Sequence, residues 1–322
     1  MRARVHILIR LTCLIASVLA AAQPAAAMET DQFTTPRAPL YDIGPTLSRK
    51  ISDIIETDRT GRDPERVLSE WVGSNIFVSH LGSWVKQFRV EGGTVSFLPS
   101  VFRSIYGRTL SPVPFSFLFD SPTVNVYGFY LGTDKIDHFF QQGHEYYDGV
   151  TRAQANGADG AAAIAEAVAR GVKAEHTYYG TLVSGIYSNA DLAANYAGMK
   201  FYMNLRQPVR IGDRIWPPLL EPSPGGWRFR PGVDRDRLLQ AFVSDHLDES
   251  LNPSRYRFGR EAIRSRVRER CDAWIRFYTD RLARVARSGQ GFSNTWFGES
   301  YGYWLPPEDE VSIATECATL SH

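Results

Sequence analysis

The 322-residue sequence has few cysteines and almost no net charge. Its three cysteines, Cys13, Cys271 and Cys317, are too few for a small disulfide-rich scaffold. The 36 basic residues nearly cancel the 35 acidic ones and leave a formal charge of +1, so we expect no nucleic-acid partner. With 43% hydrophobic and 22% charged residues, the composition is that of a folded globular protein rather than a disordered one.

Familiar catalytic motifs are also missing. The sequence contains no glycine-rich phosphate loop and no G-x-S-x-G nucleophile elbow. The segment 144–148 approaches the H-E-x-x-H helix of zinc proteases, but Asp148 stands where the second histidine is needed. His144 and Glu145 therefore remain only weak candidates for a metal site.

The first 27 residues have the pattern of a secretory signal peptide. Three arginines precede the apolar run from Leu11 to Ala22, and Ala25 and Ala27 form a small-x-small cleavage site. The apolar run is shorter than the roughly 20 residues of a membrane-spanning helix. We therefore expect residues 1–27 to be removed after Ala27, which leaves a periplasmic or secreted bacterial protein without a transmembrane span.

Two cysteines remain after this cleavage. Because exported proteins fold in an oxidising compartment, Cys271 and Cys317 are expected to form a disulfide. The alternative is a pair of buried free thiols.

The rest of the chain predicts a mainly α fold. Residues 28–48 contain three prolines and no periodicity, which predicts an extended N-terminal arm. Residues 49–322 are expected to form a single helical bundle-like domain, with short extended or β segments between its helices. Prolines and a Gly-Gly pair at 208–231 predict a loop or small hairpin excursion, and whether it separates two domains stays open.

Apolar residues at helical spacing predict the individual helices. Asp63-Pro64-Glu65 is a helix start signal, with a capping side chain, a proline in the first turn and an acid near the helix dipole. Short aromatic and β-branched runs at 94–98 and 124–131 predict strands or extended segments. The expected helices begin near residue 49 and cover 64–87, 134–148, 160–179, 190–205, 234–248 and 259–287.

One of these helices carries the densest group of polar residues, at 134–145. Asp134 and His138 are four residues apart, so a helix places them on one face. A carboxylate one turn from a histidine can orient the imidazole, set its tautomer or share a cation with it. The alternative is an exposed helix start, where Asp134 interacts with the helix dipole.

Two further helices add Glu175, Asp191 and Asn195. Glu175 follows an alanine-rich stretch whose small side chains permit close helix packing, although it could also be solvated. Asp191 and Asn195 share one face, and Gly198 would let a partner helix approach closely. Ser188 and Asp191 also fit a capping box, which is the alternative role for Asp191.

Three motifs in chain order resemble the pattern of VanZ-like proteins and the related YfiM-type envelope lipoproteins. They are Asp134-Lys135-x-x-His138-Phe139, then Glu175, then Asp191-x-x-x-Asn195-x-x-Gly198. The resemblance covers residues 134–205. It implies polar positions on helices and a role in the cell envelope, since VanZ is linked to glycopeptide resistance, but it implies no particular reaction. This sequence departs from the family in lacking a membrane span, in having Tyr178 where glutamine is common, and in lacking an arginine before the aspartate.

We expect five residues from three helices to converge in one site: Asp134, His138, Glu175, Asp191 and Asn195. They could carry out acid/base chemistry on an envelope lipid or glycan, with His138 as the proton carrier. Such a group could also hold a divalent metal, with His138, Glu175 and Asp191 as ligands. His144 and Glu145 are the weaker metal candidates. The rival hypothesis is a non-catalytic periplasmic scaffold or binding protein, in which the polar residues form a structural hydrogen-bond network.

Overall fold

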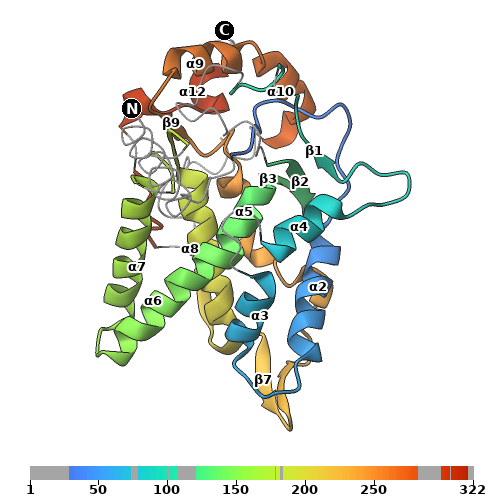
Figure 1. Cartoon of the computed structure of the whole chain (residues 1–322), viewed down its shortest axis with the longest axis vertical. Coiled ribbons are helices and arrows are strands. Elements are labelled where there is room, and N and C mark those ends of the chain that lie inside the picture. The colour runs from blue at the N-terminus through green and yellow to red at the C-terminus, as the bar shows by residue number, and fades with distance from the viewer. Residues whose placement is uncertain are drawn as a thin grey trace, which may run out of the picture.

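The protein is mainly α-helical, with short strands between the helices (Figure 1). The computed structural model describes residues 29–73, 79–100, 102–106, 121–177, 179–181, 184–281, 299–304 and 306–317. The expected signal peptide lies outside the described residues. No helix in these ranges has both the length and the apolar composition needed to cross a bilayer. The predicted fold class is confirmed.

The N-terminal helices differ in their limits from the prediction. Helix α2 spans Gly44–Thr57 and so begins before residue 49, because Pro45 occupies the first turn, where its missing N–H has no helical partner to lose. The single helix expected at 64–87 is two helices, α3 (Pro64–Val72) and α4 (His80–Gln87). α3 ends at Gly73, whose φ of +73° is a left-handed conformation that glycine adopts readily.

A small antiparallel sheet follows, as the sequence predicts. Its strands are β1 (Ser96–Phe97), β2 (Thr123–Val126) and β3 (Phe129–Gly132). β3 ends immediately before the first residue of the next helix, so the sheet fixes where that helix starts.

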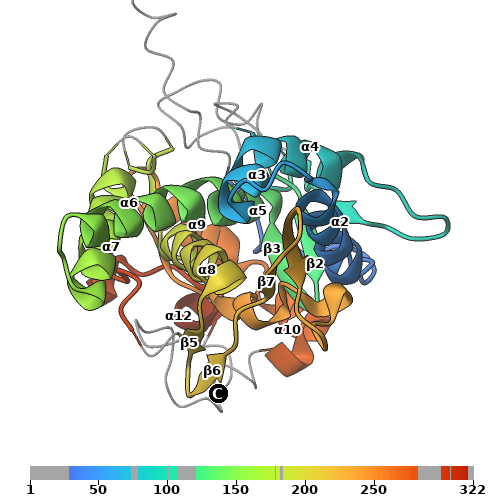
Figure 2. The same cartoon turned by 90° about the horizontal axis from the view of Figure 1, so that it is seen from below.

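The helices predicted for the candidate site are all present. They are α5 (Thr133–Asp137), the π-helical turn η3 (His138–Gln142), α6 (Gly143–Ala155), α7 (Gly160–Glu175) and α8 (Asn189–Arg206). α8 is buried along nearly its whole length. Figures 1 and 2 show it at the centre, with α6 and α7 on one side and α2 on the other. β4 (Ile186–Ser188), just before α8, pairs with β9 (Ser254–Tyr256).

The proline-rich excursion at 208–231 forms two hairpins, which confirms the sequence prediction. Their strands are β5 (Val209–Ile211) with β6 (Arg214–Trp216), and β7 (Leu220–Ser223) with β8 (Gly226–Phe229). The β7–β8 hairpin projects at the lower end of Figure 1.

The prediction of a helix at 234–248 is wrong. The structure has three 3-10 turns there: η4 (Arg235–Arg237), η5 (Gln240–Phe242) and η6 (Asp245–Leu247). The side chains of Asp234 and Ser244 accept hydrogen bonds from the backbone N–H of Asp236 and His246, respectively. Such local bonds offer the backbone an alternative to a continuous helix.

The C-terminal part forms a layer at the upper end of Figure 1. The helix expected at 259–287 is divided into α9 (Arg260–Arg268) and α10 (Cys271–Phe277), and residues 282–287 of that prediction lie outside the described residues. The short helix α12 (Ile313–Cys317) packs against both. The disulfide between Cys271 and Cys317 joins α10 to α12, as predicted.

Two hydrophobic cores hold the described chain together. The larger one surrounds α8 and includes Ile136 of α5, whereas the smaller one surrounds the disulfide and includes Leu251. The candidate site draws residues from α5 and from the loop before Leu251, so it lies where the two cores meet.

Candidate functional site

Lys135 is a fully buried cation at the start of α5. Its Nζ lies 2.6 Å from Oδ2 of Asp134 and 2.5 Å from Oδ1 of Asp191, and it also contacts Oε1 of Glu249. The three carboxylates come from α5, from α8 and from the loop after η6, so one ammonium group joins three distant parts of the chain. We use the name lysine cluster for Lys135 and the five acids around it: Glu29, Asp134, Glu175, Asp191 and Glu249.

His138 lies at the outer edge of the lysine cluster. Its Nε2 is 3.3 Å from Oδ2 of Asp191, and its Nδ1 is 3.0 Å from Oδ1 of Asn195. An imidazolium donates a hydrogen bond to both oxygens, whereas a neutral ring can donate to only one. His138 is 9% exposed, which is more than the 3% of Asp191 and the 0% of Lys135.

A close contact between two helical segments brings these residues together. A Cβ on Gly198 of α8 would lie 1.8 Å from the carbonyl oxygen of Phe139, and one on Gly143 would lie 2.7 Å from Cα of Gly198. Only glycine fits at these two positions, which confirms that Gly198 permits close approach. His138 also begins the π-helical turn, and such turns are rare and often found at functional sites.

Glu175, the last residue of α7, belongs to the inner part of the lysine cluster. Its Oε1 accepts a hydrogen bond of 2.9 Å from the backbone N–H of Ser188. The hydroxyl of Ser188 in turn accepts from the N–H of Asp191, so the expected cap of α8 is present. The capping box is only half formed, because the backbone N–H of Ser188 donates to Glu175 rather than to Asp191, whose side chain pairs with Lys135 and His138.

The N-terminal arm is also part of the site. The hydroxyl of Thr30 donates to Oδ1 of Asp134 at 2.6 Å. The side-chain NH₂ of Gln32 donates to the carbonyl of Tyr130, and its side-chain oxygen accepts from the backbone N–H of Glu249. These bonds fasten the arm to β3 and to the loop that carries Glu249.

Two members of the lysine cluster are charged at neutral pH. Burial opposes ionisation of Asp191, but the charges of His138 and Lys135 lower its pKa below the ordinary value. Burial likewise opposes the charge on Lys135, yet Asp134, Asp191 and the other acids hold its pKa well above the ordinary value. The pair of Lys135 and Asp191 is therefore ionic.

The lysine cluster contains more acids than the single positive charge of Lys135 can neutralise. Burial, and next the charge of Asp191, raises the pKa of Glu175 well above its ordinary value. Burial, and next the charge of Glu249, does the same to the pKa of Glu29. Burial raises the pKa of Glu249 to about 7, against the opposing charge of Lys135. At neutral pH the cluster therefore holds protons on several carboxyl groups.

Four of the five expected site residues are linked by direct contacts through Lys135 and His138, namely Asp134, His138, Asp191 and Asn195. Glu175 lies close enough to interact electrostatically with Asp191 and Lys135. His144 and Glu145 lie elsewhere, lining a cavity of about 440 Å³ beside α3. The sequence interpretation did not identify Lys135 as the centre of the site, and it did not include Glu29 or Glu249.

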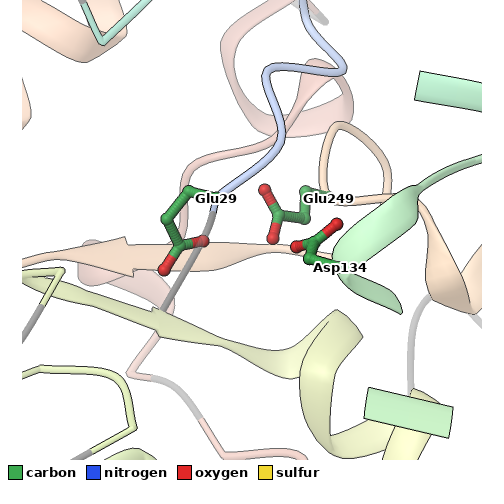
Figure 3. A group of neighbouring side chains, drawn as sticks. All are labelled: Glu29, Asp134 and Glu249. Atoms are coloured by element: carbon green, nitrogen blue, oxygen red, sulfur yellow. The ribbon is translucent and has the colours of Figure 1, made fainter. Parts of the chain in front are cut away.

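The expected metal ligands His138, Glu175 and Asp191 do not form a compact set of three ligand atoms among the described residues. The set found there is different: Glu29, Asp134 and Glu249 each place one oxygen within 4.8 Å of the others (Figure 3). Of the expected site residues, only Asp134 belongs to it.

The lysine cluster and His138 thus form a buried polar site with one edge near the surface. Comparison of the chain with models of known protein families, with curated protein sequences and with solved structures finds no match. A function for the site must therefore be inferred from its geometry and chemistry.

Proposed function

We propose that this chain is an exported protein of the bacterial cell envelope that carries out acid/base chemistry at His138, with an envelope lipid or glycan as substrate. One observation carries the proposal: the imidazole lies at the outer edge of the cluster, between the carboxylate of Asp191 and the carboxamide of Asn195. A histidine oriented by a carboxylate is the usual arrangement for a side chain that takes up and returns a proton.

Each neighbour of His138 has a defined part in this chemistry. Asp191 orients the ring and stabilises the imidazolium that forms when His138 accepts a proton. Lys135 keeps Asp191 ionised, so the carboxylate does not take the proton itself. Asn195 fixes the ring from the other side through Nδ1. With Nε2–H donating to Asp191, Nδ1 is the nitrogen that accepts the proton of a substrate hydroxyl or a water molecule, whose oxygen takes the place of Oδ1 of Asn195.

Two features support the proposed compartment. The N-terminal sequence has the arginines, apolar run and small residues of a secretory signal. The disulfide between Cys271 and Cys317 is of a kind that persists in oxidising compartments.

The scaffold hypothesis is favoured by a different observation, the complete burial of Lys135 among carboxylates from three segments. A buried ion pair of this kind fixes the arrangement of helices whether or not any reaction occurs. Under this hypothesis His138 is one more member of the network, and its hydrogen bonds serve stability alone.

Product formation tests the catalytic proposal. The purified protein is incubated with lipid and glycan fractions of bacterial envelopes, and mass spectrometry follows any change in mass. We expect the wild-type protein to convert at least one component and His138→Ala to lose at least about 100-fold in rate, the usual size of an acid/base contribution. His80→Ala, which changes an exposed histidine on α4, is the matched control and retains the rate. No conversion by the wild type, or equal rates for His138→Ala, contradicts the proposal.

Stability separates the two hypotheses. Asp191 pairs with Lys135 in both, so its variants lose stability under either one. His138 is the residue that discriminates. The catalytic proposal predicts that His138→Ala changes the free energy of unfolding by less than about 1 kcal/mol, because active-site residues are commonly not optimised for stability. A loss of about 1–3 kcal/mol, measured by urea denaturation, favours the scaffold.

A further inference from the structure

Glu29 differs from the other acids of the lysine cluster in having no hydrogen-bond partner. Its side chain is 9% exposed, yet neither carboxyl oxygen has a partner in the described part of the chain. Buried polar atoms without partners cost free energy and are uncommon in folded proteins. The position of Glu29 therefore needs an explanation that the described protein atoms do not supply.

The unpartnered carboxyl group faces two others. Figure 3 shows Glu29, Asp134 and Glu249 arriving from three separate segments, with one oxygen of each within 4.8 Å of the others. A cation such as Ca²⁺ binds oxygen at about 2.3–2.6 Å, so oxygens on opposite sides of it lie about 5 Å apart. The three oxygens are thus close enough together to share one ion.

The contacts of Lys135 do not occupy all the lone pairs of the carboxylates of Asp134 and Glu249. Its Nζ contacts one oxygen of Asp134 and one of Glu249. The hydroxyls of Thr30 and Tyr106 donate to the other two oxygens. Each carboxylate oxygen has about two lone pairs, so these contacts leave sites for metal–oxygen bonds.

We propose that Glu29, Asp134 and Glu249 bind a divalent cation that prefers oxygen ligands, of the class of Mg²⁺, Mn²⁺ and Ca²⁺. A ligand set of carboxylates without histidine or cysteine selects such hard ions over Zn²⁺ or Cu²⁺. The ion gives the oxygens of Glu29 their partner and ties the N-terminal arm to α5 and to the loop after η6. This site is separate from His138.

Binding of the metal alone tests the proposal. Protein purified from cells that express the whole sequence is freed of metal with EDTA and titrated with Mn²⁺, Ca²⁺ or Mg²⁺ by calorimetry. We expect one ion per chain, and we expect Glu29→Gln, which removes the charge but keeps the shape, to bind at least 10-fold more weakly. Glu91→Gln, a change at an exposed acid before β1, is the matched control and binds as tightly as the wild type. His138→Ala also retains binding, because the imidazole is not a ligand.

Two results overturn the proposal: absence of binding by all three ions at about 1 mM, or binding by Glu29→Gln that equals the wild type. A second measurement applies if Glu29→Gln folds poorly. Anomalous diffraction from wild-type crystals soaked in Mn²⁺ is expected to show the ion between the three carboxyl groups. Manganese bound only elsewhere contradicts the assignment.

Discussion

Lys135 and Arg281 are both buried cations that join separate parts of the chain, but they differ in the acids around them. Arg281 donates through Nε and an NH₂ group to Asp245, and the same NH₂ nitrogen lies 2.7 Å from Oδ2 of Asp248. Its guanidinium also lies over the rings of Tyr278 and Tyr130. Two carboxylates and two aromatic rings thus surround this arginine, whose other NH₂ nitrogen has no hydrogen-bond partner in the described part of the chain.

The adjacent residues Asp248 and Glu249 point to these two different cations, Asp248 to Arg281 and Glu249 to Lys135. The loop after η6 therefore connects both. Around Arg281 two acids share one guanidinium, which is a smaller excess of acid than the one around Lys135. Around Lys135 five acids share one ammonium, so protons or a cation must supply the balance, and a histidine lies at the edge. We interpret this excess of acid as the mark of a functional site.

The largest expected effect is the loss of the cation in the lysine cluster. Lys135→Met leaves the ionised carboxylate of Asp191 without its ammonium partner inside the lysine cluster, so we expect the free energy of unfolding to fall by about 3–5 kcal/mol. Arg281→Met removes a cation with only two acids around it and is expected to cost less. Urea denaturation at neutral pH measures both, with Lys173→Met, on the exposed side of α7, as a control near zero. A greater loss of stability in Arg281→Met than in Lys135→Met would contradict the comparison between the two cations.

The next effect concerns the region of Arg281. The disulfide closes a loop of 46 residues near this cation, so the double variant Cys271→Ser with Cys317→Ser is expected to lose about 2–4 kcal/mol. Amide hydrogen exchange in this variant should rise in α10 and α12, while α8, in the other core, stays protected. Equal loss of protection in α8 would show that the two regions open as one unit.

A buried acid outside both clusters supplies a reference. Burial raises the pKa of Asp137 to about 6, although Ser79 donates to its carboxylate. Because the folded protein holds this proton more tightly than the unfolded chain, the contribution of Asp137 to stability is greatest below about pH 4 and falls as pH rises through 6, by about 3 kcal/mol in total. Asp137→Asn removes this fall. The free energy of unfolding of the wild type and of Asp137→Asn is measured at pH 4 and at pH 7. An equal change between the two pH values in both proteins would contradict the raised pKa of Asp137.

The smallest effect is expected at Glu175. Because its raised pKa keeps the carboxyl group protonated at neutral pH, Glu175→Gln replaces one neutral group by another of the same shape. We expect a change below about 1 kcal/mol, whereas Asp191→Asn, which removes a paired charge, costs about 3 kcal/mol. Similar losses in the two variants would mean that Glu175 is ionised.

Much of the fold could be predicted from periodicity and small-residue patterns. The helices at 160–175 and 189–206 have regular spacing and caps at Asp159 and Ser188, and the structure contains both. The errors arose where local bonding interrupts an apolar pattern. Gly73 ends a helix that the apolar spacing would continue, and the side chains of Asp234 and Ser244 divide the segment 234–248 into turns.

The site could be predicted in part. Asp134 with His138, and Asp191 with Asn195, are one helical turn apart, so the sequence alone places each pair on one face. Glu29 and Glu249 lie in segments without periodicity, more than 100 residues from Asp134 in the chain, so no local spacing links them to it. Lys135 adjoins Asp134 in sequence, but its role as the shared counter-ion depends on Glu249 and Asp191, which no local pattern could reveal.

The central claim is that the large excess of acid around Lys135 marks a functional site, while the smaller excess around Arg281 belongs to a structural ion pair. The most direct test compares product formation from envelope lipids and glycans, and stability, in His138→Ala and Arg281→Lys. The account predicts that His138→Ala is stable and inactive, whereas Arg281→Lys is less stable but active at temperatures where it stays folded. A stable, active His138→Ala variant, or a folded Arg281→Lys variant without activity, would contradict it.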